Sequence, residues 1–167
     1  MEHPATPPPL NRDLLDMMAR GVSVIVSACG HDLTPSVMRA LGSQVSASGD
    51  FITVYLGQRP SAQLLRDVAA SGRMAVVFSE PSTHRTVQLK THHARMREAR
   101  PEDATVLQRY RLAMQQELGG LGFGPAFVSA MFAHTLDDVV AVEFTPDEAF
   151  DQTPGPRAGQ PLGGPAP

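Results

Sequence analysis

The segment RMAVVFSEPSTHRTVQLK, residues 73–90, contains two β-type runs joined by the chain-breaking residues SEPS. This pattern predicts a hairpin with a short loop. Residues 74–79 are apolar at nearly every position, so we expect a strand in a sheet that is covered on both faces. In residues 84–90, alternation puts the aliphatic side chains on one face and polar side chains, among them Gln88 and Lys90, on the other.

The polar face of the second run has two interpretations. A row of hydrogen-bond donors that ends in the fixed cation Lys90, beside a core strand, would suit an anionic or amide-rich ligand. Charged strand positions usually face water instead, and alternation alone does not separate a ligand-binding face from a solvated one.

Length and composition indicate one globular domain. The chain has 167 residues, of which 42% are hydrophobic and 19% are charged, and its formal net charge is −3. A chain of this length can bury about two thirds of its unfolded surface around a single core. Because acidic residues outnumber basic ones, we do not expect a DNA- or RNA-binding protein.

Cysteine usage and hydropathy suggest a cytoplasmic protein. Cys29 is the single cysteine, so neither an intrachain disulfide nor a multi-cysteine metal site is possible, which is typical of a reducing compartment. No segment approaches about 18 consecutive apolar residues, and no basic region followed by a hydrophobic block opens the chain. We therefore expect no membrane partner and no metal site.

The order of predicted elements indicates an α+β fold dominated by antiparallel strands. Such a sheet protects its edges most simply by closing into a six-stranded barrel with peripheral helices. We expect residues 1–9 to be a disordered tail, residues 10–150 to form the domain, and the Pro/Gly-rich residues 151–167 to lack regular structure. The expected strands are residues 22–29, 35–45, 51–56, 74–79, 84–90 and 139–144, and the longer helices follow Ser61 and Pro101.

Two further places are candidate ligand contacts. Arg39 shares a strand face with aliphatic neighbours, where an arginine is costly to bury unless an anion or a carboxylate meets it. Arg59 lies in the loop before a helix that Ser61 is placed to cap, and the unpaired N–H groups at a helix start can hold a phosphate. The alternative for this loop is a plain connector.

Several local motifs in this order resemble the pyridoxamine 5′-phosphate oxidase-like family of FMN-binding split barrels. They are PSVMR at 35–39, FITVYL at 51–56, the loop and helix beginning QRPSAQ at 58, and HRTVQLK at 84–90, and the resemblance spans about residues 14–150. The resemblance implies a six-stranded split β-barrel that forms a homodimer, with one FMN in each of two clefts between the subunits. It also implies cofactor contacts at Arg39, Gln58, Arg59, Ser61, Gln63, Gln88 and Lys90.

Three departures from the family pattern bear on that cofactor. Many members have a lysine where this chain has Gln63, so Arg59 would have to supply the missing positive charge. Many have glycine where Thr91 stands, and a side chain there could narrow the cleft. The helical insertion at residues 101–133 is longer than in a minimal family barrel and could cover the site or extend the dimer.

The resemblance therefore implies an FMN-binding protein, and our first interpretation is a flavin-dependent oxidoreductase that acts on an unidentified small molecule. No Ser-His-Asp or paired-carboxylate pattern identifies a catalytic residue, and a flavin enzyme needs none because the cofactor carries the electron chemistry. One alternative is a non-catalytic flavin- or haem-binding module, with His84, His92, His93 and His134 available as axial ligands. The other is a deazaflavin (F420)-dependent reductase of the same fold.

Overall fold

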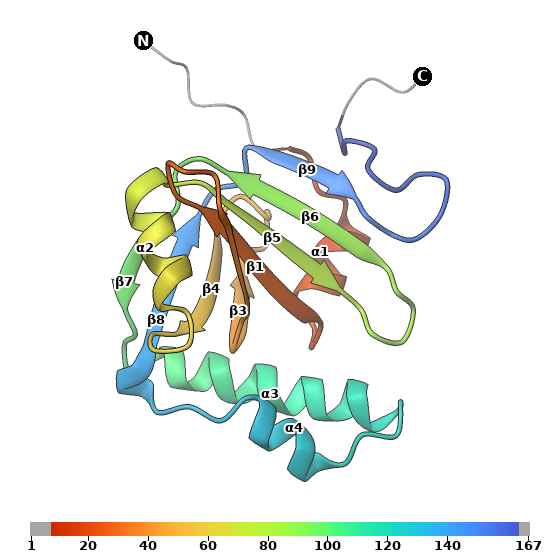
Figure 1. The fold of residues 1–167 in the computed structure, drawn as a ribbon. Helices are drawn as coiled ribbons and strands as arrows, with labels where there is room; N and C mark the ends of the chain where they lie inside the picture. The colour runs from red at the N-terminus through yellow and green to blue at the C-terminus, as the bar shows by residue number, and fades with distance from the viewer. Residues whose placement is uncertain (1–7, 164–167) are drawn as a thin grey trace.

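The computed structural model describes residues 8–163, so the N-terminal tail expected at 1–9 lies almost wholly outside the described residues. Within that range the chain forms two antiparallel sheets, of five and four strands, together with four α-helices and one short 3-10 helix (Figure 1). The α+β class is confirmed, but the expected count of six strands is wrong, because nine form. Among the described helices, none is both long and apolar enough to cross a membrane.

The strand orders are β2-β1-β5-β6-β9 and β3-β4-β8-β7. The five-stranded sheet contains β1 (Ser23–Cys29), β2 (Pro35–Arg39), β5 (Met74–Ser79), β6 (Thr86–Thr91) and β9 (Glu148–Asp151). The four-stranded sheet contains β3 (Gly42–Val45), β4 (Ile52–Gly57), β7 (Arg95–Glu98) and β8 (Val139–Phe144). The helices are α1 (Arg12–Met18), α2 (Ala62–Ser71), α3 (Asp103–Gly119), α4 (Pro125–Met131) and the 3-10 helix η1 (Leu136–Asp138).

Residues 35–45 form two strands instead of the single strand expected. β2 pairs with β1, whereas β3 pairs with β4 in the other sheet. The change of sheet takes place at Ala40, whose N–H bonds to the Val24 carbonyl on β1, and at Leu41, whose N–H bonds to the Tyr55 carbonyl on β4. This short corner lets one continuous segment join two sheets around a shared core.

Two short strands occur where we expected none. β7 lies in the basic stretch after the hairpin and pairs with β8, and β9 pairs with β6. The Pro/Gly-rich tail then turns back along β9: the N–H of Leu162 bonds to the Ala149 carbonyl, and Pro161 forms an isolated bridge with Phe150. Between Asp151, the last residue of β9, and residue 163, the tail forms turns, bends and this isolated bridge, without a further helix or strand.

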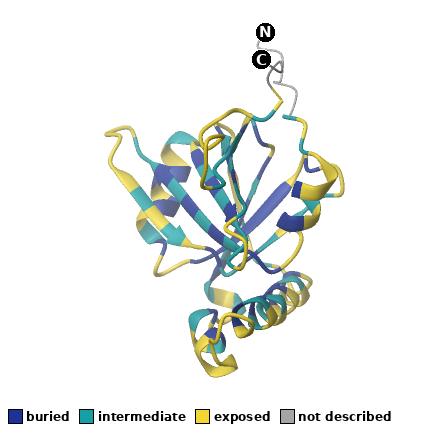
Figure 2. Cartoon of the chain, turned by 90° about the vertical axis from the view of Figure 1, so that its right-hand side faces the viewer, coloured by how far each residue is buried: buried dark blue, intermediate teal, exposed yellow. Residues whose placement is uncertain are grey.

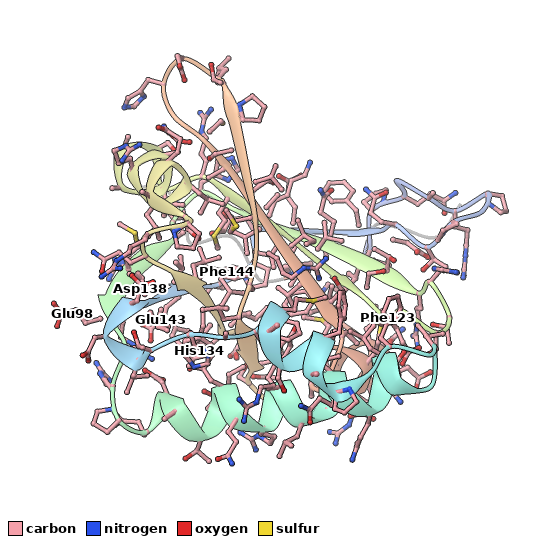
Figure 3. The ribbon with its side chains drawn as sticks, turned by 60° about the horizontal axis from the view of Figure 1, so that its bottom comes forward. Glu98, Phe123, His134, Asp138, Glu143 and Phe144 are labelled. Carbon is pink, nitrogen blue, oxygen red and sulfur yellow. The ribbon has the colours of Figure 1, made fainter. Side chains whose placement is uncertain are left out.

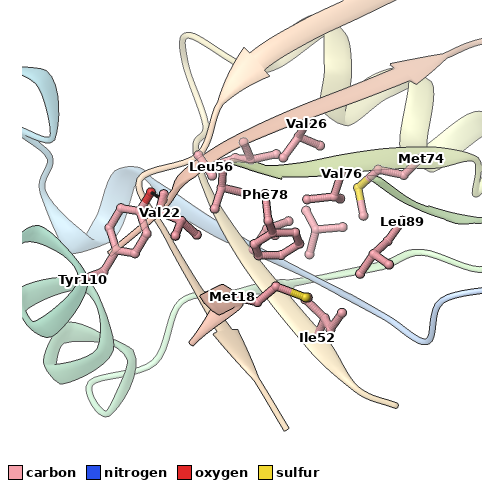
Figure 4. Packing of buried hydrophobic residues seen from close by; sticks show 14 of the residues in the cluster. Met18, Val22, Val26, Ile52, Leu56, Met74, Val76, Phe78, Leu89 and Tyr110 are labelled. Carbon is pink, nitrogen blue, oxygen red and sulfur yellow. Dashed lines mark hydrogen bonds between the residues drawn. The ribbon is translucent and has the colours of Figure 1, made fainter. Parts of the chain in front are cut away.

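One main hydrophobic core lies between the sheets. The inward positions of β1, β5 and β6 alternate strictly with outward ones, and β4 is buried at all six of its positions. Figure 2 shows these buried positions along the sheets, and Figure 4 shows how the side chains meet. Full burial of each large aliphatic side chain stabilises the fold by roughly 1.5–3 kcal/mol. The labelled core members include Met18, Val26, Ile52, Leu56, Phe78 and Leu89, all at most 1% exposed.

Helices α3 and α4 lie together below the sheets in Figure 1. Tyr110 on α3 reaches into the core and packs edge-on against Phe132, with ring centroids 5.5 Å apart. Gly21 makes close approach possible, because a Cβ on it would lie 2.4 Å from the carbonyl carbon of Ala113 on α3. The insertion at 101–133 is thus packed against the core between the two sheets.

Candidate functional site

The outer face of the five-stranded sheet carries two of the predicted cofactor contacts in one row. Arg39 is opposite Ile25, Ile25 is opposite Val77, and Val77 is opposite Gln88. Residues directly opposite one another project from the same face of a sheet. Arg39 and Gln88 are three strand spacings apart, about 14 Å.

The neighbouring row on this outer face carries Lys90. Ser27 is opposite Ala75, Ala75 is opposite Lys90, and Lys90 is opposite Glu148. The Lys90 ammonium lies 4.4 Å from the centroid of the Phe150 ring, within the range of a cation–π contact. The predicted division of β6 into a polar and a buried face is confirmed, since Val87 and Leu89 are fully buried.

A pocket of about 420 Å³ adjoins Lys90 on this face. Arg73, Lys90 and His92 bring positive or titratable groups to it, Glu148 brings a carboxylate, and Ala75 contributes apolar surface. Its volume is within the range of small-molecule sites.

Thr91 is among the residues that line this pocket, although its side chain is almost fully buried. It is only 2% exposed, and its hydroxyl accepts a hydrogen bond from the N–H of His93. The Thr91 side chain therefore has little exposed surface, and the departure from glycine at this position adds little to the outer face.

The predicted contacts at the start of α2 lie at a different pocket. Gln58 and Arg59 line a cavity of about 560 Å³ together with Thr135, Asp137 and Asp138. Asp138, labelled in Figure 3, lies 3.5 Å from the Nε of Arg59, whose side chain is 90% exposed. Two carboxylates beside one cation oppose the binding of a phosphate there.

Ser61 and Gln63 are not free ligand donors in this arrangement. Ser61 is the N-cap residue of α2, as predicted, but its side chain makes no capping hydrogen bond. It is 1% exposed, and its hydroxyl has no hydrogen-bond partner among residues 8–163. Gln63 donates a 2.8 Å hydrogen bond to Asp67 and accepts one of 2.7 Å from Arg66. Neither side chain could hold a phosphate without rearrangement of the helix start.

Within one chain the seven predicted cofactor contacts therefore form two groups. Arg39, Gln88 and Lys90 share the outer face of the five-stranded sheet, whereas the remaining four belong to the start of α2. Neither of the two pockets described above contains members of both groups. The cofactor role of all seven stays a prediction.

A buried ionic network was missed by the sequence analysis. The Asp103 carboxylate accepts a 2.8 Å hydrogen bond from Tyr55 and bonds of 2.6 and 3.1 Å from Arg97, which also pairs with Glu143. The Arg97 guanidinium lowers the pKa of Asp103 to about 2. Burial and the neighbouring carboxylate raise the pKa of the Tyr55 hydroxyl. The network joins the start of α3 to three strands. In the sequence, the charged residues of β7 were the one feature that could have indicated it.

Comparison with known proteins defines the fold. No family model and no curated protein sequence matches the chain, but solved structures do. A provisionally assigned pyridoxamine 5′-phosphate oxidase from Lactobacillus delbrueckii superposes with a TM-score of 0.52 at 12% identity, over 85% of this chain and 93% of that one. An F420 reductase gives 0.50 at 14% identity, over 80% and 93%. HutZ, the haem storage protein of Vibrio cholerae, gives 0.50 at 12% identity, over 86% and 94%.

The chain therefore has the pyridoxamine 5′-phosphate oxidase-like fold, as its sequence motifs indicated. Identities of this size establish a shared architecture and leave the ligand open. The three proteins are named for an oxidase, an F420 reductase and a haem store, so this one fold occurs in proteins with different functions.

Proposed function

We propose that this protein binds FMN against the outer face of its five-stranded sheet and works as a flavin-dependent oxidoreductase. The observation that supports this function is the arrangement of Arg39 and Gln88 in one row, with Lys90 in the next. A phosphate and a flat polar ring need cations and amide groups beside apolar surface, and this face offers them. When bound, the flavin would carry the electrons, while the chain binds and orients it.

The two predicted cationic contacts on this face, Arg39 and Lys90, are available to an anionic ligand. Arg39 donates a 2.8 Å hydrogen bond to the hydroxyl of Ser23, and Lys90 rests on the Phe150 ring. In the part of the chain that the structure describes, neither forms a salt bridge with a carboxylate. A phosphate there would gain charge-assisted hydrogen bonds without first displacing an acidic partner.

We infer that two copies of the chain complete the site. The outer face keeps apolar side chains that one chain leaves accessible: Val37 is 60% exposed, and Ile25, Ala75 and Val77 are half-buried beside Arg39. β5 was expected to be covered on both faces, and a second copy would cover the side that is open here. The same contact could bring the start of α2 from the partner towards the flavin.

A haem-binding module is a second candidate because of one observation at the same pocket. The ring Nδ1 of His92 lies 3.2 Å from Asp147, which also accepts the backbone N–H of His92. A carboxylate that engages one ring nitrogen orients the other towards a possible ligand. A phosphate-bearing deazaflavin would fit the cationic face by the same argument as FMN.

Reconstitution followed by absorption spectroscopy distinguishes these functions. The purified protein, incubated with FMN, F420 or haem and then desalted, is expected to retain two broad visible flavin bands. Retention of a single violet-absorbing deazaflavin band, or of one sharp haem band, would select the corresponding alternative. Retention of none would overturn cofactor binding. Sedimentation of the same sample should give a dimer, and a monomer at micromolar concentration would overturn the shared cleft.

A further inference from the structure

A separate pocket of about 390 Å³ lies between α3 and the segment that follows α4. α3 contributes Leu107, Gln108 and Arg111, which recur at the spacing of one helix face. The opposite side is formed by Ser129 on α4, by Phe132 and by His134, which Figure 3 shows close to the two helices. None of the seven cofactor contacts considered above lines this pocket.

Arg111 gives the pocket a positive charge that no acidic residue in the described part of the chain neutralises. Its Nε is shielded from solvent and has no hydrogen-bond partner within residues 8–163. No residue that lines the pocket is acidic, and no salt bridge to Arg111 occurs in residues 8–163. A buried N–H without an acceptor destabilises the folded state, so a small adjustment that brings an anion to this guanidinium would be favourable.

His134 and Gln108 add directed polar groups near the charge. The His134 Nδ1 lies 2.8 Å from the carbonyl oxygen of Phe132. A carbonyl oxygen can only accept, so Nδ1 carries the proton in this contact, and Nε2 of the neutral ring is an acceptor that leaves the donor role to other groups. Gln108 can donate through its side-chain amide. A planar anion could therefore meet Arg111 and a second donor together.

The inner surface of the pocket is apolar. Leu107 and Phe132 are each 1% exposed, and the Phe132 ring is fixed by its edge contact with Tyr110. One unpaired cation above aliphatic and aromatic side chains favours a ligand with a single negative charge and a compact hydrophobic body. A free phosphate would leave this apolar surface without a partner.

We propose that this pocket binds a small organic carboxylate, with the carboxylate held by Arg111 and the hydrophobic body against Leu107 and Phe132. The pocket is formed by the helical insertion, so this binding site is independent of the flavin proposed for the sheet face. It gives the insertion a ligand-binding role in addition to its packing against the barrel.

Calorimetric titration of the full-length, flavin-free protein with benzoate tests the proposal. Benzoate should bind saturably, while benzamide, its neutral isostere, and inorganic phosphate should bind at least tenfold more weakly. Equal binding of benzoate and benzamide, or no benzoate binding at all, would overturn the proposal. Because the titration needs no flavin, its outcome is separate from that of the cofactor experiment.

Matched variants on α3 locate the binding site. Arg111→Met keeps the length of the side chain and removes its charge, and we expect at least a tenfold loss of benzoate affinity. Arg109→Met removes an exposed charge two residues earlier and should leave benzoate affinity unchanged. Equal affinities in the two variants would overturn the assignment to this pocket. Should Arg111→Met fail to fold, the comparison of benzoate with benzamide on the natural protein still decides.

Discussion

The Tyr110 hydroxyl donates a 2.6 Å hydrogen bond to the carbonyl oxygen of Val22, the residue immediately before β1. Both residues are buried, and burial raises the pKa of the Tyr110 hydroxyl, which keeps it protonated as a donor near neutral pH. This single contact joins the helical insertion to the first strand of the core. The insertion is therefore expected to unfold together with the barrel.

Substitution at Gly21 should separate the insertion from that strand. In Gly21→Ala the added Cβ would lie 2.4 Å from the Ala113 carbonyl carbon, so backbone must move. We expect the free energy of unfolding in urea to fall by about 2–3 kcal/mol. Gly119→Ala is the control, because its Cβ meets nothing within 4 Å and alanine favours the helix. Equal losses in the two variants would contradict the proposed close approach.

The Asp103 network should make stability depend on acid pH. The folded pKa of Asp103 is about 2, below its ordinary value of 3.8, so the ionised carboxylate stabilises the fold fully above pH ~4. As the pH falls from about 4 to about 2, a contribution of about 2 kcal/mol should be lost. Urea unfolding across this window should show a steeper decline for the natural protein than for Asp103→Asn, which is already less stable at pH 7.

An exposed carboxylate provides the control for that experiment. Asp13 lies on the surface of α1. Asp13→Asn should retain the acid-dependent decline seen in the natural protein. If Asp103→Asn declined as steeply as Asp13→Asn, another group would be responsible for the pH dependence.

Ser61 offers a test of the helix start. Its buried hydroxyl has no hydrogen-bond partner among the residues that the structure describes, so Ser61→Ala should leave the thermal midpoint unchanged or raise the free energy of unfolding by up to about 1 kcal/mol. Ser71→Ala is the contrast, because the Ser71 hydroxyl lies 2.9 Å from the Cys29 carbonyl oxygen and its loss should be destabilising. Loss of flavin binding in Ser61→Ala would instead show that the helix start rearranges around a phosphate.

Lys90 and Arg59 distinguish the two groups of predicted cofactor contacts. Lys90→Ala should weaken FMN binding by roughly 1.5–3 kcal/mol if the ammonium makes a charged hydrogen bond to the ligand. Arg59→Ala should have a smaller effect, because Arg59 is exposed beside Asp138 in the other pocket. Flavin fluorescence quenching measures both affinities. Unchanged binding in Lys90→Ala would favour the solvated interpretation of this face.

The hairpin at 73–90 could be predicted because strict alternation and a breaker specify two strands and their faces locally. The corner at Ala40 and Leu41 could not be predicted. Each of these residues donates its N–H to a carbonyl on another strand, so the corner depends on tertiary contacts and not on the local sequence. β7 and β9 were missed for a similar reason. Short, polar edge strands form because a neighbouring strand offers free backbone groups, and local propensity carries little of that information.

For the candidate site too, the sequence predicted what depends on local alternation and missed what depends on tertiary contacts. Periodicity correctly put Gln88 and Lys90 on one face of their strand. The sequence could not show that Arg39 lies on the same face of the same sheet, because that depends on how the strands pair. The acidic surroundings of Arg59 come from η1, almost 80 residues later, and no local pattern reports them. The unpaired hydroxyl of Ser61 likewise depends on how tightly α2 packs.

The return of the chain along β9 affects how this protein should be handled. Phe150, whose ring supports the Lys90 ammonium, is bridged to Pro161, and Leu162 is bonded to Ala149. Removing the last dozen or so residues would delete Pro161 and Leu162, which hold β9 from one side. We expect the Phe150 ring, and with it the Lys90 ammonium, to become less well fixed. Affinity tags are therefore better fused to the amino terminus, and a shortened version of the chain would be a poor substitute in any ligand assay.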